Sequence, residues 1–187
     1  MPLWELILIA AIVVIVAVAA VAVRSALSKR KTQRLKGHFG PEYDRTVDEV
    51  GQRDAEHELT ERERKREKLD IVPLSAQARS GYAQQWRTVQ TAFVDDPSTA
   101  MGEADELVTR VMRERGYPID DFDQQAADIS VDHPTVVDNY RAAHTILLSQ
   151  ADGGVGTEEQ RQAFVHYRAL FDKLLETDNE TSQEARA

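Results

Sequence analysis

The residues from Leu6 to Val23 form an uninterrupted run of eighteen apolar side chains, with no charged or polar group among them. At about 1.5 Å per residue, a helix of this length covers roughly 27 Å, which is close to the hydrocarbon thickness of a bilayer. The run is rich in β-branched residues, but backbone groups in lipid must pair within the segment, so a helix is favoured. We therefore predict a transmembrane helix over residues 1–23.

A basic segment over residues 24–40 follows the apolar run directly. Because basic residues stay on the cytoplasmic side of a membrane, we expect a single-pass protein of the cell membrane. Its N-terminus would lie outside and its C-terminal domain in the cytoplasm. The alternative is a cleaved signal peptide, since Ala17 to Ala19 resembles a cleavage site, although the first five residues lack the basic group that such a peptide carries. The basic side chains are Arg24, Lys29, Arg30, Lys31, Arg34 and Lys36.

The same cations have two interpretations that are compatible with each other. They act as a topology signal, or they face anionic lipid and contribute about 1 kcal/mol each near its surface. The bilayer is therefore the first partner that we expect.

Gly40-Pro41 breaks the chain, and we predict that a charged stalk helix occupies residues 41–70. Glu58 and Arg62, like Glu61 and Lys65, are four residues apart and would pair along its surface. A solvated stalk is the favoured interpretation. A coiled coil would need apolar residues at its a and d positions, and these are missing after Val50.

Residues 71–176 show apolar side chains at helical spacing, separated by Gly and Pro. We predict an all-α fold with a small bundle of four to five helices, and a disordered tail over residues 177–187. Ser75, Asp96, Asp120 and Thr157 are the expected helix caps. The predicted inner faces carry Tyr82, Trp86, Val89 and Phe93; Met101, Ala104, Leu107, Val108, Val111 and Met112; Val136, Tyr140, Ala143 and Leu147; and Ala163, Tyr167, Leu170 and Leu174.

Charge and composition exclude several classes of function. Residues 37–187 hold 17 basic and 31 acidic residues, a net charge of −14 that repels phosphate backbones, so we expect no nucleic-acid partner. The chain has no cysteine, which excludes disulfides and thiolate chemistry. No phosphate loop, nucleophile elbow or HExxH motif is present in the sequence, and we expect no cofactor.

The candidates for metal binding are His133, His144 and His166, with Asp132 as a further ligand. Imidazole with carboxylate suits zinc or a similar ion. No two of these histidines are three or four residues apart, so histidines bonded within the core are the competing interpretation. For Arg141, Arg161 and Arg168 we expect ion pairs with the many acids.

Four strings of the chain are similar to an uncharacterised family of short bacterial membrane-anchored proteins. These strings are His38 to Asp44, Phe93 to Pro97, Arg115 to Pro118, and Ser130 to Pro134 followed by Tyr140-Arg141. The resemblance covers most of residues 36–175 and implies a single span. It implies no activity, because none is known for that family, and no site residue follows from it.

The favoured hypothesis is a membrane-anchored, non-enzymatic helical module that binds a protein partner or acts as a scaffold. A small metal-dependent hydrolase that uses the clustered His and Asp residues is one alternative. The other is a sensor or regulator at the membrane whose histidines titrate near neutral pH.

Overall fold

The computed structural model describes residues 3–151 and 153–176, and for residues 3–11, 13, 14 and 151 it describes the backbone alone. All regular structure in this part of the chain is helical, which confirms the predicted all-α class. The predicted tail over residues 177–187 lies outside the described residues. The described residues form eight helices: α1 (Leu3–Phe39), α2 (Pro41–Val50), α3 (Gln52–Arg66), α4 (Ala76–Asp95), α5 (Pro97–Arg115), α6 (Phe122–Asp132), α7 (Val137–Ala151) and α8 (Thr157–Leu175).

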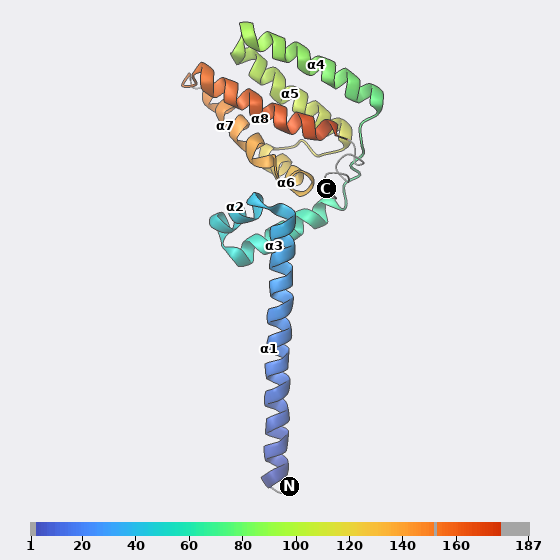
Figure 1. The fold of residues 1–187 in the computed structure, drawn as a ribbon, viewed down its shortest axis with the longest axis vertical. Coiled ribbons are helices and arrows are strands. Elements are labelled where there is room, and N and C mark those ends of the chain that lie inside the picture. The colour runs from blue at the N-terminus through green and yellow to red at the C-terminus, as the bar shows by residue number, and fades with distance from the viewer. Residues whose placement is uncertain (1–2, 152, 177–187) are drawn as a thin grey trace.

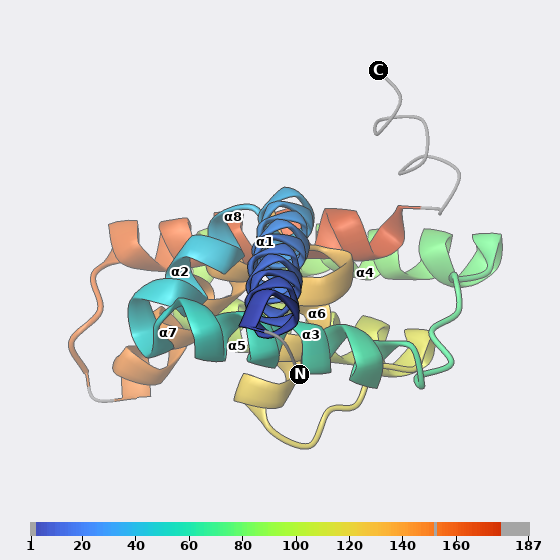
Figure 2. The same cartoon turned by 90° about the horizontal axis from the view of Figure 1, so that it is seen from below.

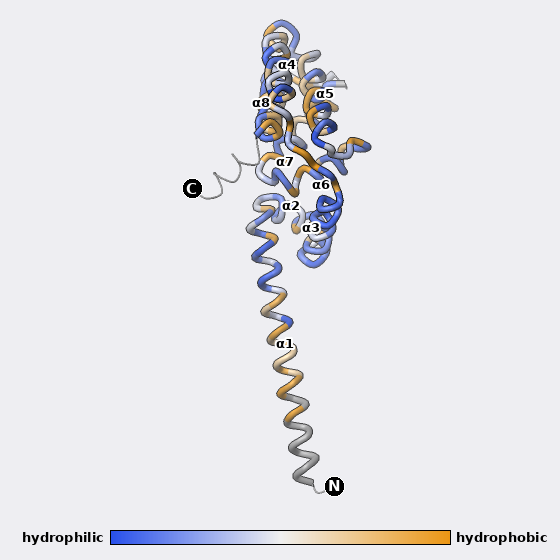
Figure 3. The backbone as a smooth tube through the Cα atoms, turned by 90° about the vertical axis from the view of Figure 1, so that its right-hand side faces the viewer, coloured by the Kyte–Doolittle hydropathy of each residue, from blue (hydrophilic) through white to orange (hydrophobic). Residues whose placement is uncertain are grey.

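Helix α1 is a long rod that projects away from all the other helices (Figure 1). The predicted apolar and basic segments are parts of this one helix, and Figure 3 shows its colour change from apolar to polar as it approaches the rest of the molecule. It ends at Phe39 because Gly40 adopts a positive φ of 52° and Pro41 begins a new helix.

None of the helices in the described part of the chain reaches both the length and the apolar character that a bilayer crossing requires. The predicted span includes residues 6–11, 13 and 14, whose side chains lie outside the described residues. The transmembrane helix therefore stays a prediction.

The predicted stalk helix over residues 41–70 is wrong. Gly51, with a φ of 82°, divides this segment into α2 and α3, which fold back against the end of α1 (Figure 2). Leu59 and Ala55 of α3 are fully buried, so the helix is not a solvated stalk. The charged side chains of α3 have the spacing expected for a helix that faces water, but many of them form ion pairs with residues of α1, α2 and α6.

A small apolar core joins the end of α1 to α2, α3 and α6. Leu35 and Phe39 of α1, Tyr43 of α2 and Leu59 of α3 pack there with Val131 of α6. Leu35, Phe39 and Leu59 have no exposed surface. Since burial of such a side chain contributes about 1.5–3 kcal/mol, this core fastens α1 to the rest of the protein, which we call the head (residues 40–176).

Helices α4 to α8 form the main bundle, as predicted, with the large core in their midst. Trp86 of α4 lies against two rings of α8, with centroids 5.0 Å from Phe164 and 4.6 Å from Phe171. All four predicted inner faces are confirmed: most of their residues are buried, and Tyr82, Phe93 and Leu147 are partly buried against the same core.

The helix ends agree with the prediction at some positions and differ at others. The side chains of Ser75 and Asp96 cap α4 and α5 as predicted. For α6 the cap is Asp121 instead of Asp120, because its carboxylate accepts from the backbone N–H of Gln124 at 2.8 Å. Helix α8 is preceded by Gly156 instead of being capped by Thr157, and the carboxylate of Glu159 accepts from the Gly156 N–H.

Gly116 ends α5 in a left-handed conformation, with a φ of 97°. A methyl group on this residue would lie 2.5 Å from the carbonyl oxygen of Asp70 in the segment between α3 and α4. Nearby, the Val72 N–H donates to the carbonyl of Arg115 at 2.9 Å. The segment therefore lies directly on the end of α5, and only glycine fits this approach.

We predict that Gly116→Ala destabilises the protein by at least about 1–3 kcal/mol, because alanine resists the left-handed conformation and meets the Asp70 carbonyl. Gly102→Ala is the matched control, since Gly102 lies within α5 with open space around it. That change should leave stability unchanged or raise it by about 0.5–1 kcal/mol. Urea unfolding followed by circular dichroism measures both, and equal effects would contradict the prediction.

Candidate functional site

The three candidate histidines lie at different places in the bundle. His133 ends α6, His144 lies within α7 and His166 within α8. The His144 ring stacks on Phe122 at 3.7 Å between centroids, and its Nδ1 lies 3.8 Å from Asp105. Among the described residues, no three His, Asp or Glu side chains are grouped closely enough to hold a metal ion.

Asp132, the fourth candidate ligand, joins α3 to α6. Its Oδ2 accepts from Arg66 Nε and from the hydroxyl of Tyr117, both at 2.5 Å. The pKa of Tyr117 is raised by its burial and by the neighbouring Asp132. This carboxylate is thus engaged in a structural network.

Burial lowers the pKa of His133 to about 4. The charge of Arg115 lowers it as well, while Asp132 acts in the opposite direction. The Nε2 atom of this ring is buried and makes no hydrogen bond to any described residue. His133 is therefore neutral near pH 7 and does not titrate in the range that a sensor of neutral pH needs.

The predicted basic cluster divides into two groups in the structure. Arg34 makes a bidentate bond to Glu63 of α3, at 2.8 and 2.7 Å. Lys36 pairs with Asp44 of α2 at 3.2 Å and lies over the Tyr43 ring. These two cations hold α1 to the head, whereas the other four are nearer the exposed part of the rod.

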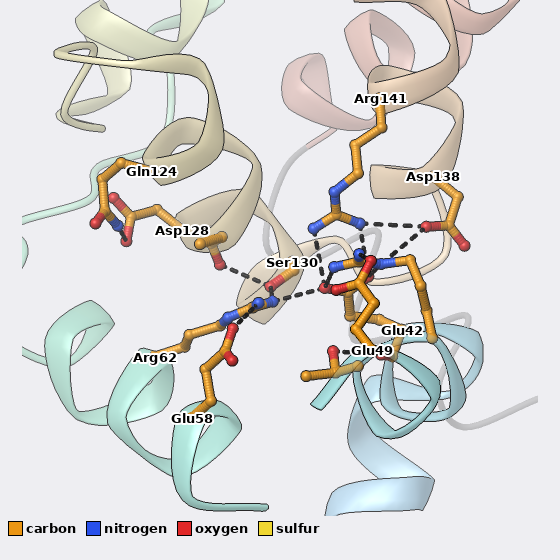
Figure 4. Close-up of polar contacts among 12 residues, drawn as sticks. Glu42, Glu49, Glu58, Arg62, Gln124, Asp128, Ser130, Asp138 and Arg141 are labelled. Atoms are coloured by element: carbon orange, nitrogen blue, oxygen red, sulfur yellow. Dashed lines mark hydrogen bonds and ion pairs between the residues drawn. The ribbon is translucent and has the colours of Figure 1, made fainter. Parts of the chain in front are cut away.

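A buried carboxylate joins α2 and α3 to helix α7 of the main bundle, and the sequence did not identify it as a site. Glu42, at the start of α2, has no exposed side-chain surface. It accepts hydrogen bonds from Arg45 of α2, Arg62 of α3 and Arg141 of α7, which we call the Glu42 cluster (Figure 4). Two consecutive helices, α2 and α3, and the distant helix α7 therefore each direct an arginine to one acid.

Both carboxylate oxygens of Glu42 accept hydrogen bonds from the arginines of the Glu42 cluster. Arg141 is bidentate, at 2.6 and 2.9 Å, and Arg45 is bidentate at 2.9 and 2.9 Å. Arg62 donates to Oε1 at 2.6 Å and to Ser130 of α6 at 3.2 Å. Such charge-assisted, paired bonds are strong and fix the orientation of the groups that make them.

Burial by itself raises the pKa of Glu42, as expected for a carboxylate removed from water. The hydrogen bonds from Arg45 and Arg141, the charge of Arg141 and the hydrogen bond from Arg62 outweigh this effect and lower the pKa to about 2. Glu42 is therefore ionised throughout the physiological range.

An open groove of about 520 Å³ lies beside the Glu42 cluster, between α2, α3, α6 and α7. Its charges are mixed and largely paired: Arg45 with Glu49, and Arg62 with Glu58. The lining residues are Arg45, Glu49, Glu58, Arg62, Asp121, Asp123, Gln124, Ala127 and Arg141. This chemistry suits the packing of helices better than it suits a small anion.

Glu42 was not among the candidate site residues predicted from the sequence, whereas ion pairs were expected for Arg141. The Arg141 expectation is confirmed by its bonds to Glu42 and Asp138, and those of Arg161 and Arg168 by Glu158 and Asp172. No local signal distinguishes Glu42 from the many other acids, because two of its three arginine partners, Arg62 and Arg141, lie 20 and 99 residues away in the chain.

We predict that Glu42→Gln lowers the free energy of unfolding by about 3 kcal/mol, because it leaves buried guanidinium groups without their counter-charge. Glu49→Gln is the control, since Glu49 is an exposed partner of the same Arg45, and it should change stability by less than about 1 kcal/mol.

Wild-type stability should also fall as pH drops from 4.5 toward about 2, where the folded-state carboxylate of Glu42 takes up its proton. Urea unfolding of both variants and of the wild type over this pH range measures these changes. An equal loss of stability in Glu42→Gln and Glu49→Gln would contradict the first prediction, and a wild-type stability that does not fall below pH 4.5 would contradict the second.

We also predict a second pH window that belongs to His133. Its folded pKa lies below that of the unfolded chain, so the unfolded state binds the extra proton first. Stability should therefore decline as pH falls from 6.5 to about 4. Proton NMR of the imidazole locates its midpoint, and His133→Gln should remove this part of the decline. A midpoint at or above 6.5 would be incompatible with the burial described here.

A comparison of the chain with protein-family models, curated proteins and solved structures finds no match to any of them. The resemblance to short membrane-anchored bacterial proteins therefore stays an expectation, and the functional argument depends on this chain's own geometry.

Proposed function

We propose that this protein is a membrane-anchored, non-enzymatic helical module that holds an acidic head at the cytoplasmic surface and binds a protein partner there. The observation that carries the proposal is the exposed apolar surface of α1, directly before a group of cations. The hydrocarbon core of the bilayer would cover the apolar surface, and the anionic headgroups would attract the cations.

The exposed part of α1 carries many large apolar side chains, and their contact with water is unfavourable. Seven large apolar side chains on this one rod are 51–69% exposed. Complete burial of a fully exposed side chain of this kind contributes about 1.5–3 kcal/mol, so covering the exposed part of all seven supplies roughly 6–13 kcal/mol toward a state that covers them. A helix that is apolar on all sides is typical of a membrane segment. The residues are Ile12, Ile15, Val16, Val18, Val21, Val23 and Leu27.

The connection between this rod and the head supports a module that is held in a defined position. The same helix enters the small core through Leu35 and Phe39, and Arg34 binds Glu63 beside it. A head tethered by a flexible linker would sample many orientations, whereas here α1 continues into the fold without a break. The head would thus present a fixed face to a partner at the membrane.

The charge of the head favours a partner with a basic surface. Residues 37–187, which include the head and the residues that flank it, carry a net charge of −14, which attracts cations and is repelled by an anionic leaflet. Electrostatic complementarity of this kind accelerates association and selects among partners. Capture of partners from a detergent extract with the full chain tests this part, and repeated recovery of none would count against it.

We predict that Val16→Arg reduces membrane retention of the full chain, because an arginine near the centre of a span costs about 2.5–3.5 kcal/mol on insertion. Val94→Arg is the matched control: Val94 is an exposed valine of α4 in the head, and it should tolerate the same change. Alkaline extraction of membranes followed by immunoblotting measures retention. A wild-type chain that is washed off would refute the anchor.

A further inference from the structure

Four cations near the junction of α1 and α3 are not used in packing the head. Arg24, Lys29 and Arg30 of α1 and Arg53 of α3 make no ion pair with any residue that the structure describes, in contrast to Arg34 and Lys36. Arg53 was not part of the predicted basic cluster, and it joins these cations only because α3 folds back along α1.

A cavity of about 650 Å³ lies between α1 and the beginning of α3, and two of these four cations, Arg24 and Arg53, line it together with Lys31. Arg24 and Lys31 line it from α1, and Arg53 lines it from α3. Guanidinium and ammonium groups, together with a hydroxyl, are the donors that bind phosphate oxygens in proteins. The complete lining is Arg24, Leu27, Ser28, Lys31, Gln52, Arg53, Glu56 and His57.

The only acid in this lining is held by other residues. Glu56 is buried, and its Oε1 accepts from the hydroxyls of Thr32 and Tyr43, at 2.6 and 3.2 Å, and from the amide of Gln52 at 2.9 Å. Its carboxylate thus belongs to a polar network within the fold. The lining of the cavity therefore holds three cations, Arg24, Lys31 and Arg53, against this one engaged carboxylate.

An apolar strip on α1 continues from the same place toward the exposed end of the rod. It consists of Val16, Ala19, Ala20, Val23 and Leu27, with Arg24 at its border. Arg24 and Leu27 line both the strip and the cavity. The surface therefore changes from apolar to basic over about one helical turn, which matches a molecule with an acyl chain and an anionic phosphate.

We propose that this cavity binds the phosphate headgroup of an anionic phospholipid, while the lipid's acyl chains lie along the apolar strip of α1. Arg24, Lys31 and Arg53 hold the phosphate. The inference rests on the proposed membrane anchor and deepens it, since it assigns the lipid class and a contact from α3, a helix outside the span.

The test uses the full chain in phosphatidylcholine vesicles, with or without phosphatidylglycerol. After an alkaline wash and mild detergent extraction, native mass spectrometry counts the lipids that stay bound. We expect the wild type to retain phosphatidylglycerol over phosphatidylcholine. Arg53→Gln should weaken this binding about fivefold, which corresponds to about 1 kcal/mol per cation. Lys31→Gln should have a similar effect.

Arg64→Gln is the control, because Arg64 is an exposed cation of the same helix that pairs with Glu61 outside the cavity. It should keep wild-type lipid retention, and circular dichroism should show all three variants folded. If Arg53→Gln inserts normally and retains as much phosphatidylglycerol as Arg64→Gln, the lipid site is refuted while the anchor stands.

Two further outcomes are decisive. Excess glycerol 3-phosphate, which has the phosphate without the acyl chains, should not displace the bound lipid, and complete displacement would overturn the lipid assignment in favour of a soluble phosphate. A wild-type chain that leaves the vesicles in the alkaline wash would overturn the anchor and the lipid site together.

Discussion

The buried carboxylate of Glu42 is the interaction on which the arrangement of the head depends. Removal of a charge from water costs several kcal/mol, and this cost is offset only where strong partners are fixed around it. Here α2, α3 and α7 each supply an arginine to the same acid. Two residues that are 99 positions apart in the chain are thereby brought into contact, and α2 and α3 are joined to the main bundle.

Polar and ionic contacts also join α3 to α6. Arg62 reaches Ser130 at 3.2 Å, Lys65 reaches Asp128 at 3.7 Å, and Arg66 reaches Asp132. These contacts turn a helix with few apolar residues into a packed layer between α1 and α6. As a result, α1 meets a rigid head, and the proposed anchor would transmit a fixed orientation to whatever binds there. The folding back of α3 also places Arg53 in the lining of the same cavity as Arg24, which is the origin of the proposed lipid site.

Sequence periodicity predicted the main bundle well, since its inner faces obey the helical spacing that burial of apolar surface demands. The stripe through Trp86 and Val89 is buried as expected, and so is the face from Met101 to Met112. The sequence did not predict every cap position correctly, because Asp120 and Asp121 are equally able to accept a backbone N–H. The stalk prediction failed because charged side chains that pair across helices have the same composition as charged side chains that face water.

By itself, the sequence determined the helical class, the apolar run with its following cations, and the inner faces of α4 to α8. All of these are local properties, set by side-chain spacing within one helix. Only the tertiary structure decided the return of α2 and α3 onto α1, the burial of Glu42 among three arginines, and the meeting of Arg53 with the cations of α1. These features join residues far apart in the chain, and the free energy of an ionic contact depends on burial and geometry that a linear pattern does not contain.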